Sequence, residues 1–221
     1  MNYYFSKKYL SDMLFFFIPL SLEAMIVILN KFWILTIDHI LFFVLLIILW
    51  GFLYIILNKL DLVNNFKKLL LFIIFFVGIE QAIKIFLNNM FKGSDMLLLV
   101  KNVLYLSIKK NIFNSYYLSI FKIQIPVYVL IILKFTILLL LYFGFKYYLQ
   151  KYNNKWCNIA FVFCISASLC SLIDTIAWGY SLDYFLIKSI NYSDGKDIYL
   201  SIGLASFFTG LNQIQKNNNK K

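Results

Sequence analysis

Residues 166–185 read SASLCSLIDTIAWGYSLDYF, and this stretch decides how the rest of the chain is interpreted. It starts as an apolar helix and reaches a glycine at position 179, with Asp174 before that glycine and Asp183 after it. A carboxylate at the depth of a lipid bilayer costs several kcal/mol unless it faces a polar cavity or a partner. Both aspartates are therefore candidate functional residues.

The composition indicates an integral membrane protein. The 221 residues are 62% hydrophobic and only 14% charged, and the mean hydropathy is +0.79. A soluble domain of this size would expose too much apolar surface. The net charge of +11 comes from lysine alone, because the chain has no arginine. Lysines between apolar spans are usually topology signals, so we expect the lipid bilayer as a partner and no nucleic acid.

Apolar segments long enough to cross a membrane recur along the whole chain. They run over residues 13–29, 40–57, 69–87, 126–145, 156–179 and 198–214. The longest connector, residues 88–123, contains V-L-Y-L-S-I at 103–108, which is typical of a strand, and polar turn residues follow it. The sequence thus predicts an all-α membrane protein with about six transmembrane helices and a small extramembrane β-rich element at 88–123.

The distribution of lysines predicts the orientation. Six spans put both termini on one side, together with the connectors after the second and fourth spans. These segments (1–10, 58–68, 146–155 and 215–221) hold eleven lysines, against eight in the segments of the other side. By the positive-inside rule we expect a multi-pass protein of the cell's inner (cytoplasmic) membrane with both termini in the cytoplasm. Several polar residues then converge on the outer leaflet beside the 88–123 segment: Glu80, Lys84, Asp174 and Asp183.

The remaining polar or reactive residues do not indicate a metal centre or a cofactor. Cys157, Cys164 and Cys170 are too widely spaced for a metal site and are interpreted as small packing residues. The single histidine, His39, has only Asp38 beside it and is interpreted as a polar pair at the edge of a loop. Glu80 and Lys84 are four residues apart, so they share one helix face and can pair.

Three of these features resemble motifs of signal peptidase II, the membrane-embedded aspartic peptidase that removes signal peptides from prolipoproteins. Residues 80–84, EQAIK, resemble the family's D-Q-x-x-K at the outer end of its first helix. Asn111 is the nearest match to the Asn of its N-x-G-A-A-F motif in a strand-rich extramembrane region, although the Gly-Ala-Ala is absent.

The third feature is the opening stretch, which resembles the family's G-G-x-x-G-N-x-x-D-R followed by V-V-D-F, without a gap. Ser171 stands at the Asn of that motif, Asp174 at its Asp and Thr175 at its Arg. Asp183 falls on the V-V-D-F aspartate, one of the two catalytic carboxylates of the family. The resemblance therefore implies a catalytic role for Asp183 and a supporting or substrate-binding role for the others: Glu80, Lys84, Asn111, Ser171 and Asp174.

The last motif of the family, F-N-x-A-D, departs from this agreement. It supplies the second catalytic aspartate at the head of the last helix. With Gly210 as anchor, residues 200–204 occupy the motif and Leu204 stands where the aspartate belongs. An aspartic peptidase needs two carboxylates that share one proton. Either the chain is a catalytically impaired member with Asp183 alone, or Asp197 replaces the lost partner through a shift of two helical turns.

The sequence therefore predicts two regions and leaves two functions open. Residues 1–66 would form an extra pair of transmembrane helices, and residues 67–221 a four-helix domain of the signal peptidase II type. The first function is binding of prolipoprotein signal peptides, with cleavage impaired. The alternative is a six-helix uptake subunit for a small molecule, in which the polar residues make ordinary interhelical contacts.

Overall fold

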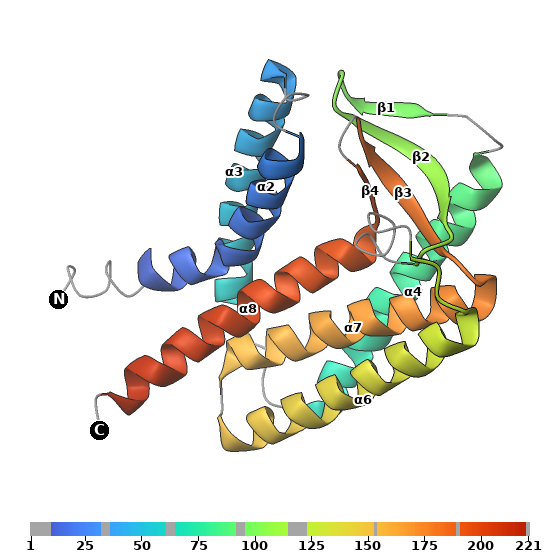
Figure 1. The fold of residues 1–221 in the computed structure, drawn as a ribbon. Helices are drawn as coiled ribbons and strands as arrows, with labels where there is room; N and C mark the ends of the chain where they lie inside the picture. Colours follow the sequence, from blue (N-terminus) through green and yellow to red (C-terminus); the bar gives the residue numbers. More distant parts are fainter. Residues whose placement is uncertain are drawn as a thin grey trace.

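The computed structural model describes residues 10–31, 36–60, 65–91, 96–114, 123–152, 154–188 and 191–219. This part of the chain is mostly helical and carries one small antiparallel sheet (Figure 1). The helices are α2 (Ile18–Lys31), α3 (Ile37–Lys59), α4 (Phe66–Met90), α6 (Val127–Lys151), α7 (Lys155–Trp178) and α8 (Gly195–Asn218). The strands are β1 (Leu97–Val100), β2 (Leu104–Asn111), β3 (Ser181–Ile187) and β4 (Asn191–Ser193).

Among the described residues, four helices are long and apolar enough to cross a membrane, namely α3, α4, α6 and α7. The prediction of six spans is thus confirmed only in this part. The first predicted span, 13–29, is not one helix, because the helix of residues 10–16 breaks at Phe17 and α2 follows with Pro19 in its first turn. Proline has no N–H to donate and fits that position. The 14 residues of α2 measure about 21 Å, less than the roughly 30 Å of a hydrocarbon core.

The sheet is built from two connectors that lie far apart in the sequence. Its strands pair in the order β1-β2-β3-β4, all antiparallel. The predicted strand at 103–108 corresponds to β2, whereas the connector between the last two predicted spans, for which no strand was predicted, forms β3 and β4. That part of the prediction was wrong because β3 gains its hydrogen bonds from β2, a partner that local sequence does not reveal. Residues 92–95 and 115–122 of the predicted platform lie outside the described residues.

Helix α7 forms the centre of the helical layer, and α6 lies at its edge (Figure 1). In the most apolar window of α7, 72% of residues are buried within the protein, against 6% for α6. The contact between α7 and α8 is close, because a Cβ atom at Gly203 would lie 2.5 Å from the sulfur of Cys164. Gly210 meets Cys157 in the same way one heptad further on, at 3.1 Å. The three cysteines are buried and unbridged, as expected of packing residues.

The N-terminal helices contact the rest of the protein at both ends. Phe16 and Tyr54 pack against Trp156 at the start of α7. At the other end, the His39 Nε2 lies 3.0 Å from the carbonyl oxygen of Lys188, which follows β3. Asp38 accepts a hydrogen bond of 3.0 Å from Asn102, in the turn between β1 and β2. These contacts connect α3 to the sheet.

Candidate functional site

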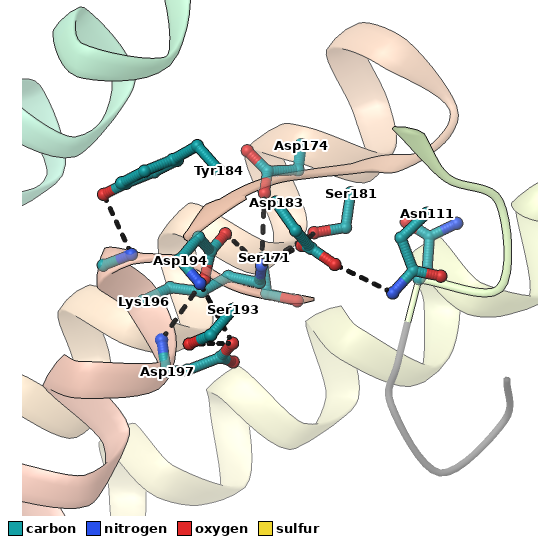
Figure 2. A network of polar contacts seen from close by, with 12 residues as sticks. Asn111, Ser171, Asp174, Ser181, Asp183, Tyr184, Ser193, Asp194, Lys196 and Asp197 are labelled. Carbon is teal, nitrogen blue, oxygen red and sulfur yellow. Dashed lines mark hydrogen bonds and ion pairs between the residues drawn. The ribbon is translucent and has the colours of Figure 1, made fainter. Parts of the chain in front are cut away.

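Buried acidic and basic side chains gather where α4, α7, β3 and the head of α8 meet. We call this group the sheet-side cluster, and none of its members is more than 8% exposed. Figure 2 shows the part of it that β3, α7 and α8 contribute. The members are Glu80, Lys84, Asp174, Asp183, Asp194 and Lys196.

Helix α4 supplies the central cation of the cluster. Lys84 and Glu80 lie on one face, as their spacing predicts, with 3.3 Å between the Lys84 Nζ and the Glu80 Oε1. The same Nζ lies 2.6 Å from an oxygen of Asp174 and 2.7 Å from an oxygen of Asp194. Lys84 therefore compensates three carboxylates that burial would otherwise make very costly.

Strand β3 holds Asp183 between two polar partners. Ser181 stands two residues earlier, on the same face of the strand, and its hydroxyl donates to Asp183 at 2.9 Å. Asn111, the last residue of β2, donates from its side-chain amide to the other carboxylate oxygen at 3.1 Å. Register explains this contact, since Asn111 and Ser181 are paired across the two strands. The carboxylate of Asp183 is thus fixed in orientation by neutral donors.

Asp194 is the residue that caps the N-terminus of α8. Its side chain accepts a hydrogen bond from the Asp197 N–H, while its second oxygen contacts both Lys84 and Lys196. Burial by itself would raise the pKa of Asp194, but the two ammonium groups hold it below its ordinary value of 3.8. Asp194 is therefore ionised wherever both lysines are charged.

A tyrosine and a glycine connect the head of α8 to α4. The Gly195 N–H donates to the hydroxyl of Tyr184 at 2.9 Å, and this hydroxyl donates to Glu80 at 2.8 Å. A Cβ atom at position 195 would lie 2.0 Å from a Glu80 oxygen, so only glycine fits here. Burial and the Glu80 carboxylate raise the pKa of Tyr184, which keeps its hydroxyl a proton donor.

Asp194, and not Leu204, lies at the head of the last helix. Helix α8 begins at Gly195, so its head carries Asp194, and Leu204 lies about 15 Å further along the helix at 1.5 Å per residue. Residues 190–194, directly before α8, read I-N-Y-S-D, which is similar to F-N-x-A-D. Gly210, the anchor used for that motif, packs closely against α7. The signal in the sequence is the pair Asp194 and Asp197, which forms a capping box.

Asp197 lies apart from the cluster. Its side chain is exposed, and one of its oxygens accepts hydrogen bonds from the Ser193 hydroxyl and from the Asp194 N–H. Figure 2 shows it beside Ser193, beyond Asp194 as seen from Asp183. Its role as a substitute for the second aspartate is not favoured by this placement, because its carboxylate completes the helix cap.

The end of α7 shows how the other motif positions are used. Asp174 accepts from Gln81 at 3.1 Å in addition to Lys84. Thr175 stands at the family's Arg position, and a cation nevertheless reaches it, because the Lys134 Nζ of α6 donates to its hydroxyl at 2.6 Å. The same Nζ donates to the backbone carbonyl of Ser171. Lys134 was not predicted as a site residue, although it is the one charge within its span.

The described residues were also considered as possible metal ligands. No group of three or more histidine, cysteine, aspartate or glutamate side chains in this part of the chain is arranged to hold a metal ion. Two lysines lie among the four acids of the sheet-side cluster instead.

Fold and site together define a multi-pass membrane protein with a buried acid–lysine cluster beneath a small sheet. A family profile described as "Signal peptidase (SPase) II" matches residues 71–212. The chain therefore belongs to the signal peptidase II family, whose members are aspartic peptidases of lipoprotein processing. This family membership leaves the uptake-subunit alternative without support.

Comparison with solved structures agrees on the fold. Two of them, both described as a bacterial membrane enzyme solved by the in meso method, share 18% identity with this chain. The first has a TM-score of 0.57 and covers 71% of this chain; the second has a TM-score of 0.55 and covers 66%. In each case 93% of the other chain is covered. A search of curated proteins finds no match.

Proposed function

We propose that the protein is an aspartic-type peptidase that cuts lipoprotein signal peptides at the membrane surface, with Asp183 and Asp194 as its two catalytic carboxylates. One observation carries this proposal. Asp183, from β3, and Asp194, from the head of α8, both contact the amine of Lys196, the first at 3.5 Å. Two carboxylates that both contact one small group lie near enough to each other to be considered as an aspartic dyad.

The chemistry requires the pair to hold one proton between two carboxylates. The ionised carboxylate takes a proton from water while the resulting hydroxide attacks the carbonyl carbon of the scissile peptide bond. The protonated carboxyl gives its proton to the carbonyl oxygen. When the tetrahedral intermediate breaks its C–N bond, the amine leaves with a proton and the new carboxylic acid remains, so one water is consumed and the dyad is restored.

The two aspartates have different surroundings, and this mechanism needs such a difference because one carboxylate acts as the base and the other as the acid. Asp183 has neutral donors, the Ser181 hydroxyl and the Asn111 amide. Asp194 is held by the charged amine of Lys84 at 2.7 Å. We assign the general-acid role to Asp183, because Asp194 contacts two lysine amines, whereas Asp183 contacts one, Lys196 at 3.5 Å, beside its neutral donors.

The position of the cluster suits a substrate embedded in lipid. Strand β1 exposes three consecutive leucines at residues 97–99, each close to half exposed. An apolar strand of this kind is stable against the bilayer surface and unfavourable in water. We infer that the sheet lies on the outer surface of the inner membrane with both termini in the cytoplasm, so that a signal peptide emerging from the bilayer meets the cluster under the sheet.

The test is a prolipoprotein cleavage assay with purified protein in detergent, run with enzyme in excess over substrate. Asp183→Asn and Asp194→Asn should each abolish the cleavage that the wild type shows. Asp197→Asn is the matched control and should cleave like the wild type, because that side chain only caps α8. Cleavage that survives in either of the first two variants, or is lost in Asp197→Asn alone, contradicts the assignment.

A further inference from the structure

Lys196 is a buried lysine in the first turn of α8, and its amine lies among acidic groups. The Nζ contacts an oxygen of Asp194 and lies 3.5 Å from Asp183 and 3.8 Å from Asp174. It also donates to the hydroxyl of Ser181 at 2.7 Å. Figure 2 shows the side chain reaching back from α8 toward β3.

This position coincides with the place that catalysis requires. A water molecule that is activated by one carboxylate and lies close to the other must contact both, and the Lys196 amine already has those contacts. The amine therefore occupies the contacts with Asp183 and Asp194 that such a water would make. Its four-carbon stem has several rotatable bonds, so the amine can leave without a change in the backbone of α8.

The charge of Lys196 acts against the sharing of a proton. In a carboxylate dyad, repulsion between two like charges raises the pKa of one member until it keeps a proton at working pH. An ammonium between the two carboxylates removes that repulsion and stabilises both negative charges. The pair then lacks the protonated carboxyl that acts as the general acid.

We propose that Lys196 is an internal inhibitor of the aspartate pair, so that the resting protein is latent and cleavage requires the amine to be displaced by the entering substrate. This inference rests on the proposed function and adds a regulation to it. An incoming peptide carbonyl and its water compete with the amine for the same carboxylate oxygens. A substrate that binds tightly along the membrane therefore displaces the amine and is cut. Without a bound substrate the amine stays in place, and no water is activated.

A different use of the same contact is a serine–lysine pair, in which Lys196 deprotonates Ser181 for nucleophilic attack. That mechanism needs a neutral lysine at working pH. Three carboxylates within 3.8 Å of the amine favour its charged form instead. Ser181 is also engaged as a donor to Asp183. We therefore assign Ser181 to positioning, and cleavage by a Ser181→Ala variant distinguishes the two mechanisms.

The first measurement is the single-turnover cleavage rate of a prolipoprotein by Lys196 variants. Lys196→Gln and Lys196→Met remove the charge and should raise the rate by about 10²-fold or more, within the range that general acid catalysis contributes. Lys196→Arg keeps the charge and should stay as slow as the wild type. Lys146→Met, an exposed lysine on α6, controls for loss of charge elsewhere. Equal or slower cleavage by both neutral variants overturns the inference while the proposed function stands.

A second measurement is independent of activity. Protein labelled with ¹³C at the aspartate carboxyl carbons is titrated by NMR. Because only aspartates carry the label, Glu80 gives no signal in this measurement. At neutral pH, Lys196→Gln should show one protonated aspartate that is absent in the wild type and in Lys196→Gln combined with Asp183→Asn. No such signal overturns the inference. If this signal appears but no variant cleaves, the proposed function fails and the effect of Lys196 stands. Cleavage that depends on Ser181 and not on Asp183 overturns both.

Discussion

The two ends of α8 carry clusters of similar composition, in which lysine faces aspartate, yet their charge balance differs. At the far end from the sheet, Asp12 accepts hydrogen bonds from Asn212, Gln213 and Lys216 at 2.8–3.0 Å. We call this group the far-end cluster. It contains one acid and one lysine, and Lys216 is 32% exposed. The sheet-side cluster places four acids around two lysines, all of them buried.

This difference in charge balance indicates a structural role for the far-end cluster and a functional role for the sheet-side cluster. The far-end cluster is neutral, each Asp12 oxygen has a donor, and water screens its lysine, so it connects the start of the chain to α8 at little cost. The sheet-side cluster has more buried acids than lysines to neutralise them. Such an excess of buried acid is costly for stability alone, which is typical of a functional site.

The largest effect is expected on the cleavage rate, from variants that test whether Asp183 and Asp194 act as one catalytic unit. Asp183→Asn and Asp194→Asn should each lower the cleavage rate by about 10³-fold or more, and the double variant should cost little beyond either single one. Asp12→Asn, in the far-end cluster, should leave the rate within about twofold, because it lies at the opposite end of α8. Single-turnover rates decide this. Additive losses would mean that the two aspartates act independently.

A smaller effect is expected on stability from the two lysines. Lys84→Met removes the cation shared by three buried carboxylates and should lower the free energy of unfolding by about 3–5 kcal/mol. Lys216→Met, the matched change in the far-end cluster, should cost less than about 1 kcal/mol because the lysine is partly exposed. Denaturant titration in mixed micelles measures both. Similar losses for the two variants would remove the distinction between the clusters.

The smallest effect concerns the segment of α8 between the clusters. Gly203→Ala should cost about 1–3 kcal/mol, because the new methyl group meets the sulfur and backbone of Cys164. In contrast, Gly144→Ala on α6 meets open space and should stabilise the helix by roughly 0.5–1 kcal/mol. The same denaturant titration serves here. If Gly203→Ala is neutral, the two ends of α8 are not held in place by close packing against α7.

Local sequence was sufficient for features that depend on near neighbours. Hydropathy located α3, α4, α6 and α7, since each of these helices contains its own hydrogen bonds and a long apolar run. The spacing of Glu80 and Lys84 was sufficient to put them on one face, and strand β2 followed from its β-branched and aromatic residues.

Only the tertiary structure determined which residues complete the site. β3 exists as a strand because β2 pairs with it, and that pairing brings Asn111 to Asp183. The start of α8 depends on the fit of Gly195 against Tyr184 and Glu80 and on the Asp194 cap, which local sequence does not reveal. Asp194 and Lys196 reach the cluster for the same reason. Contacts between residues distant in the chain decide where a helix begins, and the position of every charge on its first turn follows from that.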